Sequence, residues 1–332
     1  MPPSTRSPAM SDAPDEFAWI DKLRPLTRSD RRALDLRDDA AVIAGRPGYD
    51  LIVSTDAMVE GVHFPAGEGP EMIARRLLRT SLSDLAAKAA APFGYLLMTA
   101  WPADRDWAYR DAFIGGLAGD GEAFGVALLG GDTVATPGPL TLCATVLGWA
   151  PAGRAVLRSG ARAGDLLIVC GAIGDGWLGL AASKGEIADV HGRLARRYRL
   201  PTPLLALREA LRAHARAAAD VSDGLLADAG HIAEASGLAL SLDIERFPVS
   251  PEGDAWCAAR PDPHAARLAL AGGGDDYAIV CAVDPAEELV FTGAVRALGL
   301  PAERAGAFAV GEGLEVTAGG AKIAAPRLGW RH

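Results

Sequence analysis

The sequence predicts an α+β protein of two domains, over about residues 15–150 and 151–332. A chain of 332 residues can bury more than one core. Apolar runs typical of strands are interleaved with segments of helical spacing. The turn-forming stretch Pro151-Ala152-Gly153 marks a boundary near the middle of the chain. Residues 1–14 are rich in Pro, Ser and Asp and are expected to form a disordered tail.

In the first domain, Phe17, Ile20 and Leu23 recur at helical spacing, and the stretch from Glu71 to Ala90 keeps one apolar face. The strands are short apolar runs that end in polar or glycine-containing turns. The expected elements, in order, are a helix at 16–23, a strand entered from a charged turn within 37–43, a strand at 50–56, extended chain at 59–65, a helix at 71–90, a strand at 94–101, a helix at 104–119, and strands at 126–130 and 140–149.

In the second domain, the turn Ala163-Gly164-Asp165 leads into an apolar run that predicts the first strand. The expected elements, in order, are a strand at 166–170, helices at 204–218 and 224–236, strands at 238–244 and 277–283, a helix at 285–298, and a strand at 314–317. Both domains should therefore hold mixed sheets with flanking helices.

Composition excludes several classes of protein. The net charge of −9 argues against general nucleic-acid binding. No apolar run reaches about 18 residues, so no membrane span is expected, and the N-terminus lacks the apolar core of a signal peptide. The four cysteines form no CxxC pair and lie mostly in apolar runs, which predicts reduced core thiols in a cytoplasmic protein.

One short run, Gly130-Gly131-Asp132-Thr133, follows an apolar stretch and is interpreted as a glycine turn that presents a carboxylate after a strand. Similar runs recur, each with Asp beside Gly, Ser or Thr at the edge of an apolar segment. They are Arg37-Asp38-Asp39-Ala40, Ser54-Thr55-Asp56, Leu82-Ser83-Asp84-Leu85, Asp220-Val221-Ser222-Asp223-Gly224 and Gly273-Gly274-Asp275-Asp276-Tyr277. Such surroundings suit hard cations and phosphate oxygens.

The residue types at these runs favour Mg²⁺. His63 is the only histidine near them, so zinc held by histidines is not expected. Ligation by Asp, Ser and Thr oxygens is typical of magnesium. The sequence also lacks the lysine-containing P-loop motif and the protein-kinase signature set, so any nucleotide must be bound in another way.

The stretch Gly174-Asp175-Gly176-Trp177-Leu178-Gly179 matches the glycine pattern of a dinucleotide-binding turn. That fingerprint also needs an acidic residue about 20 positions further on, at the end of the next strand. Glu186 and Asp189 come too early, and no predicted strand carries them. We therefore predict that these glycines let a helix pack closely on its strand.

Together with Glu60-Gly61-Val62-His63-Phe64 and Arg158-Ser159-Gly160, these aspartate runs resemble, in their order, the thiamine-monophosphate kinase family. That family is similar to the aminoimidazole ribonucleotide synthetase superfamily of ATP-using enzymes. The match runs from about Asp38 to the C-terminus. The resemblance implies a two-domain aminoimidazole ribonucleotide synthetase-like fold and a homodimer built through first-domain strands. It also implies transfer of the ATP γ-phosphoryl group to thiamine monophosphate, the last step of thiamine diphosphate biosynthesis.

The resemblance also implies roles for individual residues, with Asp84 and Asp132 central to catalysis. Several Mg²⁺ ions would be held by Asp39, Ser54, Thr55, Asp56, Asp84, Asp132, Asp220 and Asp223. ATP would be contacted by Gly131, Asp132, Arg158 and Ser222. Thiamine monophosphate would be contacted by His63, Asp275 and Trp330.

The expected chemistry agrees with this set of residues. The acceptor is an ionised phosphate oxygen, so no strong general base is needed, and metal ions can neutralise the phosphate charges. Arg158 can make a bidentate contact with phosphate. Trp330 can lie against the pyrimidine or the cationic thiazolium ring, and a cation–π contact contributes about 0.5–2 kcal/mol. The sequence departs from the family where Lys88-Ala89 replaces Met-Gly, and where Asp275 replaces a longer Glu.

Structural alternatives are open for the same residues. Asp56 and Asp132 are common types in turns after strands, and Asp220 or Ser222 can cap the following helix. Further alternatives are solvent exposure for Asp84 and Arg158, a satisfied structural histidine for His63 and a core aromatic for Trp330.

Functional alternatives are open as well. Selenophosphate synthetase usually carries a reactive cysteine near the N-terminus, whereas the first cysteine here is Cys143. The hydrogenase maturation relative usually ends in cysteine, whereas this chain ends in His332. Outside kinase chemistry, the alternatives are a Mg²⁺-dependent phosphohydrolase and a nucleotide-binding module without turnover.

Overall fold

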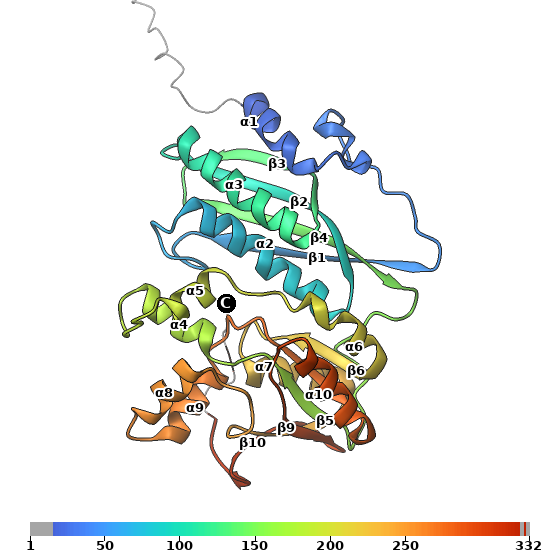
Figure 1. Ribbon diagram of the computed structural model, residues 1–332, viewed down its shortest axis with the longest axis vertical. Helices are drawn as coiled ribbons and strands as arrows, with labels where there is room; N and C mark the ends of the chain where they lie inside the picture. The colour runs from blue at the N-terminus through green and yellow to red at the C-terminus, as the bar shows by residue number, and fades with distance from the viewer. Residues whose placement is uncertain (1–15, 326–328, 330–332) are drawn as a thin grey trace, which may run out of the picture.

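The computed structural model describes residues 16–325 and 329. Two β-sheets, each with its own helices, lie one above the other, and a helix of the first half faces the second half (Figure 1). No helix in this described part of the chain is long and apolar enough to cross a membrane. All four cysteines are free thiols, and three of them are buried.

The first sheet has four strands in the order β1-β4-β2-β3. Its strands are β1 (Tyr49–Val59), β2 (Ala91–Pro102), β3 (Ala127–Thr136) and β4 (Thr141–Pro151). Strand β4 is antiparallel to both its neighbours, and β2 is parallel to β3. Helices α2 (Pro70–Ala87) and α3 (Trp107–Phe124) cover one face, with α1 (Glu16–Leu23) beyond them (Figure 1).

The core of this half lies between the sheet and its two long helices. Leu77 and Leu82 of α2, Phe113 of α3 and Val146 of β4 are completely buried in one cluster. Much of the opposite face of the sheet is open, because alternate residues of a strand point to opposite faces. On that open face, the apolar side chains of Leu51, Val53, Leu96 and Val134 are 37–53% exposed.

The second sheet has seven strands in the order β11-β10-β7-β9-β5-β8-β6. Its strands are β5 (Leu166–Cys170), β6 (Ala215–Asp220), β7 (Ala239–Asp243), β8 (Ile279–Val283), β9 (Ala302–Ala309), β10 (Gly313–Ala318) and β11 (Ala321–Lys322). Its helices are α4 (Asp175–Ser183), α5 (Arg193–Arg199), α6 (Arg208–His214), α7 (Leu225–Ser236), α8 (Pro251–Ala258), α9 (Pro263–Ala271) and α10 (Glu288–Ala297).

The central strands of this second sheet are buried on both faces. Every residue of β5 and of β8 is buried, which explains why both strands are continuous apolar runs and do not alternate. One face packs with α7 in a cluster that contains Val169 and Ile232. The other face packs with α10 in a cluster that contains Ile168 and Phe291.

Several sequence predictions about elements were wrong. The segment 37–43 is irregular chain and not a strand. The helix predicted over 204–218 ends at His214, because the alanines that follow form β6, whose small side chains fit against β8. Good helix propensity was overridden there by sheet pairing. The predictions also missed strand β9 and helices α5, α8 and α9, which are short or weakly amphipathic.

The run Gly130-Gly131-Asp132-Thr133 is not a turn after a strand, because it lies inside β3. A Cβ atom on Gly131 would lie 1.8 Å from the carbonyl oxygen of Leu97 on β2. Glycine is therefore needed at this position for the close approach of two strands.

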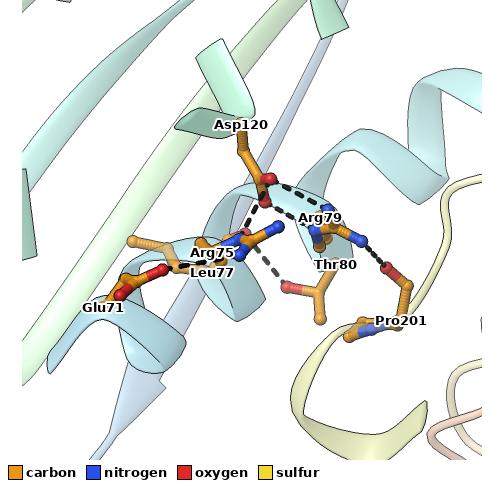
Figure 2. A network of polar contacts seen from close by, with 7 residues as sticks. All are labelled: Glu71, Arg75, Leu77, Arg79, Thr80, Asp120 and Pro201. Carbon is orange, nitrogen blue, oxygen red and sulfur yellow. Dashed lines mark hydrogen bonds and ion pairs between the residues drawn. The ribbon is translucent and has the colours of Figure 1, made fainter. Parts of the chain in front are cut away.

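A buried ion-pair network joins the two halves (Figure 2). The carboxylate of Asp120 on α3 is completely buried and accepts hydrogen bonds from Arg75 Nε at 3.2 Å and from Arg79 Nη2 at 2.9 Å. Arg79 also donates to the carbonyl oxygen of Pro201, at 3.1 Å. Helix α2 is thereby fixed both to its own layer and to the second half of the chain.

Candidate functional site between the two halves

A cavity of about 1100 Å³ lies between the two halves. The first half contributes the end of β1, the turn after it and one face of α2. The second half contributes α4, α5, the β6–α7 connection and the loop before β8. Seven of the predicted site residues line the cavity: Asp56, His63, Asp84, Asp220, Ser222, Asp223 and Asp275.

Three carboxylates from three separate elements form an acidic cluster. Asp56 comes from β1, Asp84 from α2 and Asp220 from the end of β6. Burial and then the charge of Asp84 raise the pKa of Asp56 to about 6. The same two causes, in the same order, raise the pKa of Asp220 to about 7. The cluster therefore resists holding three negative charges unless a cation balances them.

Hydroxyl groups accompany these carboxylates. Ser54 Oγ donates to Asp84 Oδ2 at 2.5 Å. The buried hydroxyl of Ser83 lies close enough to Asp220 to lower its pKa, yet it makes no hydrogen bond of normal length within the described residues. Carboxylate and hydroxyl oxygens are the donors that Mg²⁺ prefers, so the residues present fit a hard cation.

The carboxylates do not form a preformed metal cage. Within residues 16–325 and 329, no three Asp, Glu, His or Cys side chains are gathered closely enough to enclose an ion. Burial first, and then repulsion from the charge of Asp84, make it unfavourable for Asp56 and Asp220 to be ionised close together without a cation.

The β6–α7 connection is held by a carboxylate that the sequence predictions did not include. Asp228 on α7 is 1% exposed and accepts hydrogen bonds from the backbone N–H groups of Ser222 and Asp223, each at 3.0 Å. The N-cap of α7 is Gly224, without a side-chain hydrogen bond, so neither Asp220 nor Ser222 caps that helix. The capping alternative is therefore wrong for both residues.

His63 lies in the turn after β1, on the cavity wall. Its Nδ1 accepts a hydrogen bond from the backbone N–H of Val59 at 3.0 Å. In the neutral ring the proton is therefore on Nε2, because one ring nitrogen donates while the other accepts. His63 is suited to donate a hydrogen bond to an anion and not to remove a proton from it.

Asp275 is held tightly at another part of the wall. Its Oδ1 accepts hydrogen bonds from Arg76 Nη2 at 2.7 Å and from the Tyr277 hydroxyl at 3.0 Å. Arg76 and Tyr277 both line the cavity, but neither was among the predicted site residues. A positively charged residue at helical spacing from Asp84, eight residues earlier on α2, was the signal in the sequence.

Six predicted site residues in the described part of the chain do not line this cavity: Ser54, Arg158, Asp39, Thr55, Gly131 and Asp132. Strands β1 and β3 are the two edges of the first sheet, three strand spacings or about 14 Å apart. Asp56 aligns across the sheet with Gly131, so Asp132 points to the opposite, open face. Thr55 also points to the open face, where its hydroxyl contacts Thr145 at 3.0 Å.

Asp39 is exposed in the irregular segment that follows residues 31–36, which contact β3. Within a single copy of the protein, Asp56, Asp84 and Asp220 therefore meet at the cavity. Asp39 and Asp132 lie on the other side of the first sheet.

A second cationic group lies beside the acidic cluster. Lys88, at the C-terminal end of α2, donates from Nζ to the carbonyl oxygen of Ala218 at 2.9 Å. Burial and then the neighbouring Arg158 lower the pKa of Lys88 to about 8, although the charges of Asp220 and Asp84 oppose this shift. Arg158 is exposed and lies near Lys88, so it is available to an anionic ligand at this end.

Trp330 lies outside the described residues. The backbone of Gly329 packs against Asp223, since a Cβ atom on this glycine would lie 2.7 Å from the Asp223 carbonyl oxygen.

The glycine-rich stretch at residues 174–179 binds a carboxylate of its own chain. The partly buried side chain of Asp276 accepts hydrogen bonds from the N–H groups of Gly174 at 2.8 Å and Gly176 at 2.9 Å. Burial raises the pKa of Asp276 to about 8, against the effect of these two bonds. A Cβ atom on Gly176 would meet the Asp275 backbone, and one on Gly179 would meet Leu194. We predicted that these glycines let a helix pack on its strand, and this was wrong. They let α4 pack closely against the 272–277 loop and against α5.

Two family models match the chain. The model for AIR synthase related protein, N-terminal domain, covers residues 37–150. The model for AIR synthase related protein, C-terminal domain, covers residues 162–319. These matches confirm the predicted two-domain α+β fold of the aminoimidazole ribonucleotide synthetase type.

Individual relatives point to one branch of these proteins. The chain is 53% identical to a thiamine-monophosphate kinase of Caulobacter vibrioides, over 100% of both chains. A crystal structure of thiamine-monophosphate kinase from Stenotrophomonas maltophilia has a TM-score of 0.81 and 34% identity, covering 93% of this chain and 98% of that one. A structure of AaThiL complexed with AMPPCP and TMP has a TM-score of 0.75 and 27% identity, covering 96% of each chain.

Proposed function

Since the chain belongs to the thiamine-monophosphate kinase family, within the AIR synthase related proteins, we propose that it transfers the γ-phosphoryl group of ATP to thiamine monophosphate. The products are thiamine diphosphate and ADP. The structural observation that carries this proposal is the cavity between the two halves, in which Asp56, Asp84 and Asp220 form an acidic, hydroxyl-flanked cluster.

Mg²⁺ is the proposed cation of this cluster. Asp56, Asp84 and Asp220 would hold it, with hydroxyl groups such as that of Ser54 nearby. When bound, Mg²⁺ neutralises phosphate charge and aligns the attacking and leaving oxygens. Asp228 supports the cluster from behind, because it fixes the backbone that follows Asp220.

The nucleotide phosphates are proposed to lie towards Arg158 and Ser222. Arg158 supplies a planar guanidinium that matches phosphate oxygens. Lys88 adds a second positive charge at the same end, where the family more often has Met. Arg158 and Lys88 therefore lie beside the acidic cluster. This arrangement favours a ligand that binds metal ions and still has negative charge left for the two cationic side chains.

The acceptor is proposed to lie near His63. Its Nε2–H donates to the acceptor phosphate and holds it without removing a proton. The nucleophile is then the phosphate of the substrate itself, whose second pKa is about 6. No general base on the protein is required for this reaction.

A second copy of the chain is proposed to complete the site. The open face of the first sheet carries exposed apolar side chains, including Leu51, Val53 and Val134, which a partner sheet would bury. Asp132 lies on the same face, away from the cavity of its own chain. In a symmetric dimer this carboxylate, and Asp39 near the same edge, would reach the cation cluster of the partner.

A coupled assay of ADP release, with and without thiamine monophosphate, tests the proposal. We expect ADP to form only when ATP, Mg²⁺ and thiamine monophosphate are all present. ADP release without an acceptor would instead indicate a phosphohydrolase. ATP binding without ADP release in any mixture would indicate a nucleotide-binding module.

A further inference from the structure

Arg76 is a buried cation at the centre of the cavity wall. It is 4% exposed, and it lies on the same face of α2 as Thr80 and Asp84, at intervals of four residues. Asp84 belongs to the acidic cluster proposed to bind Mg²⁺. Arg76 lies about two helical turns away from Asp84 on the same face of α2. The cavity is otherwise rich in carboxylates, so a buried arginine there needs a reason.

Three contacts fix the guanidinium of Arg76, and all of them reach into the second half of the chain. Nη2 donates to Asp275 Oδ1 at 2.7 Å, and Nη1 donates to the carbonyl oxygen of Tyr198. The guanidinium carbon also lies 4.0 Å from the centre of the Tyr198 ring. The planar group is thus held in one orientation by a carboxylate, a carbonyl group and an aromatic face.

Asp275 is in turn held in an unusual backbone conformation. It has φ of +65°, and Tyr277 has φ of +52°, in the left-handed region that residues with a side chain rarely adopt. The loop is tied to the β6–α7 connection, because Asp275 N donates to Ser222 O and Tyr277 N donates to Val221 O, each at 2.8 Å. Such conformations persist where surrounding contacts determine them, and they cluster at ligand sites.

The two oxygens of the Asp275 carboxylate have different surroundings. Oδ1 accepts from both Arg76 and the Tyr277 hydroxyl. Oδ2 makes no hydrogen bond with any residue in the described part of the chain, and the side chain is 29% exposed on the cavity wall. The arrangement presents one oriented acceptor atom to the cavity.

We propose that Arg76 is a positioning residue for the acceptor substrate: it orients Asp275 so that Oδ2 receives the ring portion of thiamine monophosphate. This inference rests on the proposed function. The ring portion carries a positive charge and an amino group, which are the chemical partners of a carboxylate.

Steady-state kinetics of Arg76→Lys test the proposal. We expect the KM for thiamine monophosphate to rise about tenfold or more, with kcat and the KM for ATP within about twofold, because one charged hydrogen bond to the substrate-binding group is lost. Inhibition by thiamine, which has no phosphate, should weaken by the same factor. A tenfold change for thiamine monophosphate but none for thiamine would mean that Arg76 acts on the phosphate, and it would overturn the proposal.

Arg79→Lys is the matched control. Arg79 lies on the same helix and also pairs with a buried aspartate and a carbonyl group of the second half, but it does not line the cavity. It should change thermal stability and leave the KM for thiamine monophosphate unchanged. Equal KM increases in the two variants would overturn the proposal, because both increases would then come from disturbed packing between the two halves and not from the orientation of Asp275.

Two further variants test the proposal if Arg76→Lys does not fold. Asp275→Asn keeps the shape of the side chain and should raise the same KM, while an unchanged KM overturns the proposal. Arg76→Lys combined with Asp275→Glu should recover part of the affinity, because the longer carboxylate compensates for the altered cation. Calorimetric binding of thiamine monophosphate tests Arg76 separately from turnover, so a wild-type protein that binds without phosphorylating would count against the proposed function alone.

Discussion

Asp84→Asn is expected to make the metal-free protein more stable while it removes the response to Mg²⁺. Asp84 is the charged neighbour that contributes to the raised pKa values of both Asp56 and Asp220. The substitution keeps the size of the side chain and leaves an oxygen that can still accept the hydrogen bond from Ser54. It removes one of the charges that repel each other when no cation is present.

The magnitude follows from the pKa values. The pKa of Asp56 is raised from 3.8 to about 6, and that of Asp220 from 3.8 to about 7. Each pKa unit corresponds to about 1.4 kcal/mol, and burial contributes more than Asp84 to each value, so we assign about 1–3 kcal/mol to Asp84. A gain of this size should raise the metal-free Tm by roughly 3–8 °C.

The sign depends on pH in a defined way. Both folded-state pKa values lie above the ordinary 3.8, so the folded protein binds more protons than the unfolded chain between about pH 4 and pH 7. The stability of the metal-free wild type should therefore be highest at the acid end of this window and fall as pH rises through it. The advantage of Asp84→Asn should be small at pH 5, where Asp56 and Asp220 are protonated, and full at pH 8.

Thermal unfolding in EDTA and in Mg²⁺, at pH 5 and pH 8, provides the measurement. The wild type should gain about 2.7 kcal/mol at a Mg²⁺ concentration of 100 times Kd, and the variant much less. Glu122→Gln is the control, because this exposed carboxylate on α3 lies outside the acidic cluster and should not change the metal-free Tm. If Asp84→Asn had an unchanged or lower metal-free Tm at pH 8 and kept the full Mg²⁺ response, the reasoning would be refuted.

Three further predictions concern single residues. Asp132→Asn should fold normally but lose most kinase activity. If each site takes Asp132 from the partner subunit, refolding this variant together with Asp84→Asn should restore about a quarter of wild-type activity. No recovery of activity in that mixture would argue against a shared site. His63→Asn should raise the KM for thiamine monophosphate but keep the acidic limb of the kcat/KM profile, since the substrate phosphate titrates near pH 6; a flat profile with near-zero kcat in the folded variant would make His63 the base. Asp120→Asn should cost about 3–5 kcal/mol of stability in urea unfolding, because it leaves two arginines without their buried carboxylate partner; a loss below about 1 kcal/mol would show that water replaces this partner.

The sequence by itself determined the type of protein and most of the chemistry. Apolar periodicity predicted a long helix at 71–90, which the structure has at 70–87, and it predicted all four strands of the first sheet, because these elements bury one face each and their patterns are regular. The aspartate runs contain the three residues of the acidic cluster, and they were singled out because Asp beside Ser, Thr or Gly offers the oxygen donors that hard cations take.

Tertiary packing alone decided the secondary structure of the alanine-rich segment at 215–220. It also decided the role of the glycines at 174–179. Alanines suit a helix, and only their pairing with β8 makes them a strand. The glycines were predicted to let a helix pack closely on its strand, and only the fold shows that their N–H groups bind the carboxylate of Asp276.

Tertiary structure also decided which site residues meet. The sequence treated Asp56 and Asp132 alike, because both lie beside Ser, Thr or Gly at an apolar run. Strand pairing separates them, since they occupy opposite edges and opposite faces of one sheet. The helical spacing of Arg76 from Asp84 was a weak signal, because a positively charged residue on a helix is usually solvated. Its role becomes apparent only where α2 packs against the loop that carries Asp275. Local residue types set the chemistry a position can perform, and the register of the sheet and the contact between the halves decide which positions act together.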